Sequence, residues 1–231
     1  MALPTEARTM RLTLRALARL LDYPGPELRG QLSALPAALD EEGALSAPRR
    51  AALETFMAWL AAQDALDAEA AYVELFDRGR ATSLHLFEHV HGDSRERGPA
   101  MLALARTYAE AGLQLRADEL PDYLPVVLEY ASTLPPADAR DFLAETAHLL
   151  NAIFSALAGR DSPYAGLLAA LIELTGAPAE SVPCAAEEPL DVAWEEPPVF
   201  GGCATRGQAQ PAAPASVPLV RRPAAHAGDL A

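Results

Sequence analysis

The chain has 231 residues, of which 51% are hydrophobic and 22% charged, so it is long enough for one sizeable core with an appended segment. Its formal net charge is −14, and its 18 basic residues are all arginines. This acidic balance argues against nucleic acid or an anionic membrane as the main partner, because neutralising phosphates requires clustered cations.

The cysteines and the first residues bear on the cellular compartment. Cys184 and Cys203 are too few and too far apart for a disulfide framework or a metal pair, which favours a reducing compartment. Arginines interrupt every early apolar run before it reaches the length of a signal peptide core or a membrane span. We therefore expect a cytoplasmic protein without membrane insertion. The spacing of these arginines places them on one helix face, interpreted as a solvated face rather than a transit peptide: Arg8, Arg11, Arg15 and Arg19.

Apolar residues recur at helical spacing almost everywhere before Thr175, and no segment alternates with the period of a strand. Proline, glycine and serine punctuate this pattern and set the helix boundaries. The sequence therefore predicts an all-α fold, a single globular helical domain over residues 1–176. About nine helices are expected, near residues 6–21, 26–40, 47–62, 67–76, 83–91, 95–111, 121–133, 138–158 and 163–175.

Residues 177–231 lose the helical period and are predicted to form a Pro-rich acidic tail, partly disordered and flexible. Two interpretations of its first part remain open. It is either a solubilising strip, or a strip that docks on the body or on a partner through Leu190, Val192 and Trp194. Its acids are Glu180, Glu187, Glu188, Asp191, Glu195 and Glu196.

The segment 72–98 (YVELFDRGRATSLHLFEHVHGDSRERG) is unusually polar for a helical protein. Asp77 to Gly79 should break one helix, Thr82 or Ser83 can cap the next, and Gly92 with Asp93 should end it. We expect a helix, a charged corner, a short helix and a second charged corner. Further charges at these corners are Arg95 and Arg97.

One motif in this segment suggests a different chemistry. His85, Glu88 and His89 form H-x-x-E-H, which is also the inverted zinc-protease pattern, and two histidines four residues apart share a helix face. A hydrolytic site also needs a third ligand, for which Glu110, Glu119 and Glu129 are unspecific candidates. The alternative is that the histidines are hydrogen-bonded to nearby carboxylates or carbonyls. The sequence contains no phosphate loop, catalytic triad or cysteine nucleophile.

Tyr72, Leu75 and Phe76 match a Y-x-x-L-F pattern, and DRGR followed by SLHLFEHVHGDSRERG resembles the NarJ family of nitrate reductase assembly chaperones. The segment from Glu119 to Tyr123 (ELPDY) resembles the E-x-P-D-H element of the wider group of chaperones for molybdoenzymes of the DMSO reductase type. Tyr123 stands where that group usually has His. The resemblance spans roughly residues 14–175.

The resemblance implies two sets of site residues. One set structures the corner: Tyr72, Leu75, Phe76, Asp77, Arg78, Gly79 and Gly92. The other set binds a client peptide, with Glu119 and Asp122 meeting its cationic residues: Arg80, Phe87, Glu88, His89, His91, Glu119, Asp122 and Tyr123. Neither catalytic nor metal-binding residues are implied.

The implied function is that of a dedicated cytoplasmic chaperone, not an enzyme. It would bind the N-terminal segment of the respiratory nitrate reductase catalytic subunit in its apo form and assist molybdenum cofactor insertion before membrane docking. It would bind no cofactor stably, since the molybdenum guanine dinucleotide cofactor belongs to the client, and it would not remain in the mature enzyme. Cofactor-biosynthesis proteins are further candidate partners. The alternatives are a small zinc hydrolase using His85, Glu88 and His89, or a generic helical adaptor.

Overall fold

The computed structural model describes residues 9–92, 94–117 and 119–180, and each regular element in these residues is helical. The predicted all-α fold is confirmed. Eleven α-helices occur in this part of the chain, with a π-helical turn at Val73–Asp77 and a 3₁₀ turn at Arg80–Thr82. The α-helices are α1 (Arg11–Leu21), α2 (Pro26–Gln31), α3 (Leu35–Glu42), α4 (Ala47–Ala62), α5 (Ala65–Tyr72), α6 (Leu86–His91), α7 (Arg97–Glu110), α8 (Leu124–Ala131), α9 (Pro136–Glu145), α10 (Ala147–Ala158) and α11 (Ala165–Thr175).

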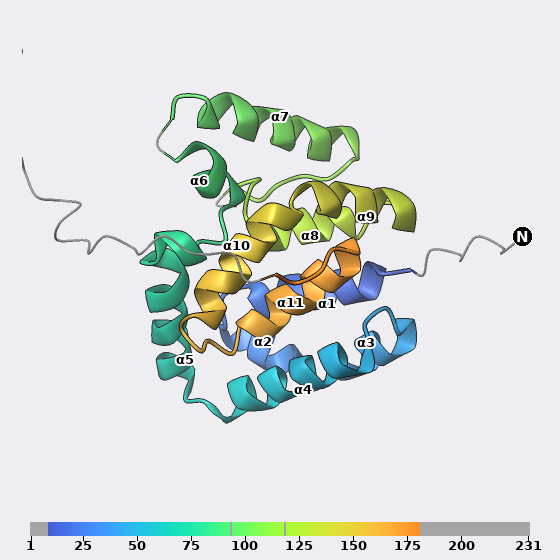
Figure 1. Cartoon of the computed structure of the whole chain (residues 1–231), viewed down its shortest axis with the longest axis vertical. Coiled ribbons are helices and arrows are strands. Elements are labelled where there is room, and N and C mark those ends of the chain that lie inside the picture. Colours follow the sequence, from blue (N-terminus) through green and yellow to red (C-terminus); the bar gives the residue numbers. More distant parts are fainter. Residues whose placement is uncertain (1–8, 93, 118, 181–231) are drawn as a thin grey trace, which may run out of the picture. The chain divides into compact units, whose positions relative to one another are not determined.

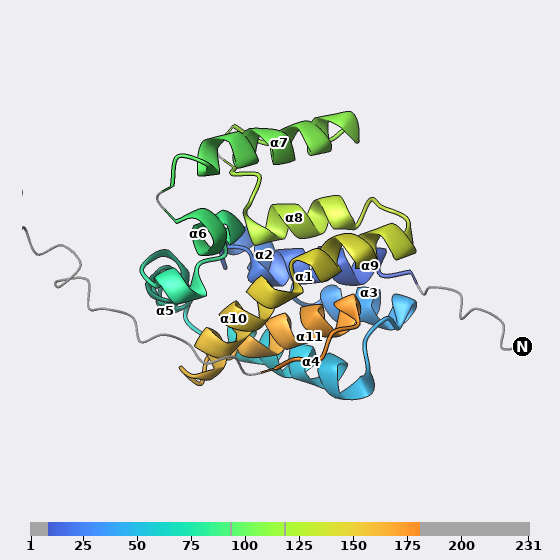
Figure 2. The ribbon, with the colours of Figure 1, turned by 45° about the horizontal axis from the view of Figure 1, so that its top comes forward.

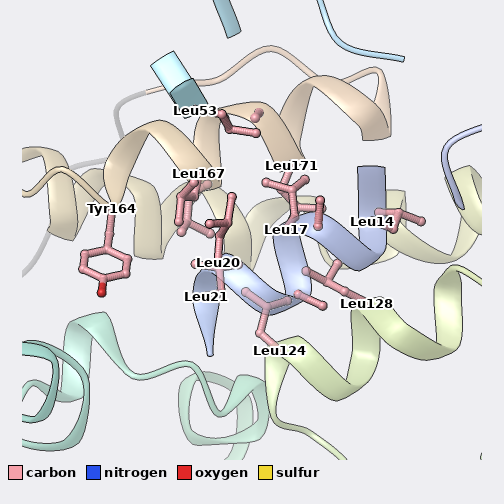
Figure 3. Packing of buried hydrophobic residues seen from close by; sticks show 14 of the residues in the cluster. Leu14, Leu17, Leu20, Leu21, Leu53, Leu124, Leu128, Tyr164, Leu167 and Leu171 are labelled. Carbon is pink, nitrogen blue, oxygen red and sulfur yellow. The ribbon is translucent and has the colours of Figure 1, made fainter. Parts of the chain in front are cut away.

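Helix α1 lies at the centre of the core and packs against α3, α8 and α11 (Figure 1). Its leucines recur at helical spacing on more than one face, so it buries side chains toward several neighbours at once. Leu17 and Leu20 are fully buried, and Figure 3 shows them between leucines of α8 and α11. Each such side chain contributes about 2 kcal/mol by leaving water. Truncation of Leu17 to Ala should therefore lower the free energy of unfolding by about 3 kcal/mol.

Helix α11 is apolar around most of its circumference and packs against α1, α4, α9 and α10. The turn before it places Tyr164 among the aromatic rings of α4 and α5. The centroid of the Tyr164 ring lies 4.8 Å from that of Phe56 and 5.0 Å from that of Phe76, both in edge-to-face geometry. This aromatic cluster attaches the Tyr72–Phe76 segment to the core.

Two of the nine expected helices are each divided in the structure, which has eleven α-helices in the described residues. The expected helix 26–40 is two helices, α2 and α3, and the expected helix 138–158 is α9 and α10, which meet at Thr146. At Thr146 the break lets α9 contact α8 while α10 contacts the 3₁₀ turn, so tertiary packing overrides a continuous apolar period. Helices α6 and α8 each begin three residues later than expected, at Leu86 and Leu124.

Helix α7 stands apart from the other helices in both views (Figures 1 and 2). It buries a single side chain, that of Tyr108, while Leu102 remains 64% exposed. The Tyr108 hydroxyl donates a hydrogen bond to the carbonyl oxygen of Pro121 at 2.9 Å, and its ring lies 4.8 Å from that of Tyr130. Tyr108 is therefore the main anchor of α7.

The described chain continues past Gly176 and stays in contact with α10. The backbone N–H of Glu180 donates to Asn151 Oδ1 at 2.8 Å, and Ala177 and Ala179 pack against the core. The predicted domain boundary at residue 176 stays a prediction, as does the docking of Leu190, Val192 and Trp194, which lie outside the described residues. In the described part of the chain, no helix combines the length and apolarity needed to cross a membrane.

Candidate binding site

The first charged corner forms where α5 passes into the π-helical turn. The backbone N–H of Arg78 donates to the carbonyl oxygen of Val73, five residues earlier, at 3.2 Å. Phe76 points into the core, while Asp77 and Arg78 are exposed and Arg78 pairs with Glu74 at 2.8 Å. The corner therefore turns its apolar residues inward and its charges outward.

Gly79 allows the chain to turn back on itself at this corner. A Cβ atom at this position would lie 2.8 Å from the carbonyl oxygen of Leu75 and would also collide with the Thr82 hydroxyl. That hydroxyl is itself hydrogen-bonded to the carbonyl oxygens of Leu75 and Gly79. The close approach of these backbone segments requires a residue without a side chain.

Two tyrosines connect the corner with the ELPDY segment. The Tyr72 hydroxyl donates to the carbonyl oxygen of Leu21 at 2.8 Å and lies 2.9 Å from the Tyr123 hydroxyl. The Tyr123 hydroxyl also donates to Asp22 Oδ1 at 3.3 Å. Burial raises the pKa of both hydroxyls well above the ordinary value, so both stay protonated. Asp22 is a member of this network that the sequence analysis missed, because nothing in its local spacing marks it.

The short helix α6 is capped from a distant segment. We predicted Thr82 or Ser83 as its cap, and this is wrong, because the residue preceding the helix is His85 and no side chain near it caps the helix. Asp122 supplies both acceptors instead: its carbonyl oxygen accepts the Leu86 N–H at 3.0 Å and its Oδ2 accepts the Phe87 N–H at 3.1 Å. At the other end Gly92, with φ of 51°, ends the helix as predicted.

The ELPDY segment is joined to the residues before α6 by an isolated antiparallel bridge between His85 and Tyr123. The backbone N–H of Leu124 donates to the carbonyl oxygen of Leu84 at 2.9 Å, and the His85 and Tyr123 rings lie 5.3 Å apart. The structure therefore brings together two motifs that are far apart in the sequence.

The carboxylate of Asp122 is completely buried, although the resemblance implied that it meets cationic residues of the client. Arg97 lies 3.8 Å from its Oδ2 and His85 Nδ1 lies 3.5 Å from its Oδ1. Arg97 also pairs with Glu88 at 3.4 Å. Because a buried charge requires partners, the geometry gives Asp122 an internal role in positioning α6 rather than a place on the surface.

The outward side of α6 carries a mixed apolar and imidazole surface. The Phe87 and His91 rings are half-buried and lie 5.5 Å apart in edge-to-face geometry, and Val90 beside them is 53% exposed. His89 Nε2 lies 2.8 Å from the carbonyl oxygen of Ser83, so this histidine also fixes α6 to the preceding loop. Arg80 is exposed. These residues form the exposed part of the predicted site.

Glu119 lies elsewhere. It lines a cavity of about 670 Å³ formed by α1, the end of α7 with the segment after it, α8 and the start of α9, and no residue of α6 lines this cavity. The ELPDY segment therefore faces two ways: Glu119 faces the cavity, whereas Asp122 and Tyr123 contact the α6 region. Arg11, Arg15 and Arg19, predicted as a solvated face, line the same cavity.

The described residues contain no group of three or more His, Cys, Asp or Glu side chains arranged to hold a metal ion. His85 faces Asp122, and the Nε2 atom of His89 is engaged by a backbone carbonyl oxygen. The H-x-x-E-H motif lies partly before the helix, because His85 precedes α6.

A family model described as nitrate reductase delta subunit matches residues 42–170. The chain belongs to this family. It is 40% identical over 195 residues to the nitrate reductase molybdenum cofactor assembly chaperone NarJ of Escherichia coli K12, which covers 80% of this chain and 83% of that protein. It is also 39% identical over 195 residues to NarW of the same organism, across 79% of this chain and 80% of NarW. The resemblance seen in the sequence motifs is confirmed.

Two further comparisons bear on the family and on the fold, respectively. The chain is 33% identical over 164 residues to a nitrate reductase molybdenum cofactor assembly chaperone, NarJ, of Bacillus subtilis. The match covers 70% of this chain and 86% of the Bacillus protein. A proposed redox enzyme maturation protein from Archaeoglobus fulgidus has a similar crystal structure, with a TM-score of 0.51, 21% identity and coverage of 72% of this chain and 94% of that one. At this identity the second likeness supports the all-α fold alone.

Proposed function

We propose that this protein is a dedicated cytoplasmic chaperone that assists molybdenum cofactor insertion into a respiratory nitrate reductase. Its client is the N-terminal segment of the catalytic subunit in the apo form, bound before the enzyme docks on the membrane. The 40% identity to NarJ across 80% of the chain is the observation that carries the chaperone role. The protein performs no catalysis itself and leaves before the enzyme is mature.

We place the client segment on the outward side of α6, where Phe87, Val90 and His91 combine apolar surface with polar edges. An amphipathic helix binds such a surface through its apolar face while its charged flank meets polar groups beside it. Arg80, Glu88 and His89 provide the charged and polar groups for those flank contacts, in addition to the pairing of Glu88 with Arg97 and of His89 with the Ser83 carbonyl oxygen. Asp122 and Tyr123 act indirectly, because Asp122 caps α6 and Tyr123 fixes the segment that carries Asp122.

Rigid placement of α6 favours binding, because α6 loses little conformational entropy when the client binds. A helix of six residues is not stable alone, and the Asp122 contacts hold it in place. Release requires that the client segment fold against its own domain once the cofactor is loaded. Neither nucleotide nor metal is consumed in this scheme.

The test is calorimetric titration of the full chain with the first 15 to about 40 residues of its cognate reductase catalytic subunit. Val90→Glu places a charge on the exposed α6 surface and should weaken binding about tenfold, because one apolar contact is lost and a charge is desolvated. Leu66→Glu is the matched control, since Leu66 is 74% exposed on α5. Equal affinity of both variants would place the client elsewhere.

A pull-down from nitrate-respiring cells separates this function from that of a generic helical adaptor. The proposed chaperone should recover the reductase catalytic subunit in cofactor-free form, and Val90→Glu should reduce its recovery while Leu66→Glu does not. Recovery of several unrelated proteins to the same extent would favour the adaptor.

A further inference from the structure

The cavity beside α1 has features that the proposed client site does not use. Its volume is about 670 Å³, and α1, α8, the end of α7 and the start of α9 enclose it. Its floor is apolar, with Met10, Tyr130 and Ala139 buried and Val126 half-buried. A concave apolar surface of this size is characteristic of a binding site.

One wall of the cavity is cationic. Arg11, Arg15 and Arg19 follow one another at intervals of four residues along α1, so their side chains project in a row with about 6 Å between neighbours. Arg19 pairs with Glu129 at 3.8 Å, which closes one end of the row. The guanidinium groups of Arg11 and Arg15 are exposed and have no ion pair within the described chain.

Several of the remaining charged and polar side chains around the cavity are already engaged, whereas Thr9 and Gln114 are exposed. Glu119 pairs with Arg116 at 3.8 Å, the Tyr108 hydroxyl donates to Pro121, and the Ser132 and Thr133 hydroxyls donate to carbonyl oxygens of α8 at 2.6 and 2.7 Å. The floor therefore presents few free polar groups to orient a small molecule. An apolar floor beside a row of charges is instead the arrangement that receives an amphipathic helix.

We propose that this cavity binds an acidic amphipathic helix of a protein partner. The apolar face of that helix covers Met10, Val126 and Tyr130, and carboxylates spaced four residues apart on its flank meet Arg11 and Arg15. Charge decides the partner class: although the chain has a net charge of −14, Arg11 and Arg15 have no ion pair within the described residues, so this wall repels a basic segment and attracts an acidic one. The site is separate from the α6 surface, so the proposal does not depend on where the nitrate reductase segment binds.

The test uses a synthetic amphipathic helix of about 16 residues with leucines on one face and glutamates at four-residue intervals on its flank. A second peptide carries lysine in place of each glutamate. Fluorescence anisotropy with the full-length protein should show binding of the glutamate peptide and at least tenfold weaker binding of the lysine peptide. Binding should also weaken as the salt concentration rises, because the contacts are exposed.

The variants separate the cavity from other basic surfaces. Arg11→Glu and Arg15→Glu should each weaken binding of the glutamate peptide about fivefold, and Val126→Gln should weaken it through the floor. Arg106→Glu, an exposed arginine of α7 outside the cavity lining, is the matched control and should leave the affinity unchanged. Equal losses for Arg15→Glu and Arg106→Glu, or equal affinity for the two peptides, would overturn the proposal.

A further measurement distinguishes this proposal from the proposed function. Arg15→Glu should keep the affinity for the reductase segment, while Val90→Glu should keep the affinity for the glutamate peptide. If Arg15→Glu weakened binding of both the reductase segment and the glutamate peptide, with an unchanged melting temperature, the two ligands would share one site. That result would overturn the proposal of a separate binding site in the cavity.

Discussion

Asp122 caps the helix that contains Phe87 although the two residues are 35 positions apart: the buried Oδ2 atom accepts the Phe87 N–H at 3.1 Å. The same aspartate accepts the Leu86 N–H through its backbone. The short helix α6 is thereby positioned by the segment that precedes α8. The orientation of its exposed surface depends on the buried contact with Asp122.

The first prediction concerns this cap. Asp122→Ala should lower the free energy of unfolding by about 3 kcal/mol, because Arg97 and the Phe87 N–H lose a buried partner. Asp122→Asn keeps an acceptor for the Phe87 N–H and should cost about 1 kcal/mol. Urea unfolding followed by circular dichroism measures both. Equal losses would show that the charge opposite Arg97, and not the cap, provides the stabilisation.

The second prediction compares two glycines. Gly79→Ala should destabilise the protein by about 2 kcal/mol, because its Cβ would lie 2.8 Å from the Leu75 carbonyl oxygen and the corner must move. Gly98→Ala is the matched control: no atom lies within 4 Å of its Cβ, and alanine favours the first turn of α7. Thermal melting should therefore show a lower midpoint for the first variant alone. A Gly79→Ala protein as stable as Gly98→Ala would contradict the tight corner.

A third prediction follows from the buried tyrosines. Burial raises the pKa of Tyr72 and Tyr123 above the ordinary value of 10.0, so the folded state retains protons that the unfolded chain releases at high pH. Their contribution to the free energy of unfolding is fully present below about pH 9 and is lost as the pH rises through the unfolded-state pKa of about 10 and above it. The free energy of unfolding should fall between about pH 9 and about pH 11.

The double variant Tyr72→Phe, Tyr123→Phe provides the control. It should be less stable at neutral pH by about 2 kcal/mol, since the hydrogen bonds to Leu21 and Asp22 are lost. Its stability should fall less steeply between about pH 9 and about pH 11, because two of the titrating groups are gone. An unchanged slope would assign the alkaline loss to other tyrosines.

The fourth prediction tests the segment after α11. A chain ending at Gly176 should be less stable than one ending at Glu180 by about 1 kcal/mol, because it lacks the contacts of Ala177 and Ala179 and the Glu180 hydrogen bond to Asn151. Differential scanning calorimetry of the two truncated proteins measures the difference. Identical melting temperatures would mean that these contacts contribute nothing measurable to stability.

Local sequence signals predicted those helices whose ends carry strong punctuation. The range 47–62 matches α4, with Ser46 before it and Pro48 in its first turn, and Gly176 ends α11 as a left-handed residue. The break after α2 was missed although Pro36 stands in the first turn of α3, and the break at Thr146 has no glycine or proline to mark it. There the packing of each half against different neighbours decides the boundary.

The candidate site was predictable in part. Gly92 and the charges at the corner follow from local chemistry, and the family motifs pointed to both segments of the site. Spacing along the chain contains no information about the pairing of His85 with Tyr123 or the burial of Asp122, which arise when separate segments meet. The arginine face of α1, predicted as solvated, is exposed at Arg11 and Arg15, and the cavity that it borders could not be seen from spacing alone.

The central place of α1 has a consequence for biosynthesis. Leu14 and Leu17 leave the ribosome well before the helices that cover them, which include α8 and α11 and end at Ala131 and Thr175. Nearly the whole domain must be translated before this leucine surface is shielded from water. During that interval the nascent chain exposes the apolar surface of α1. Slow translation, or premature termination before α11, should therefore yield fragments that aggregate and do not bind the client.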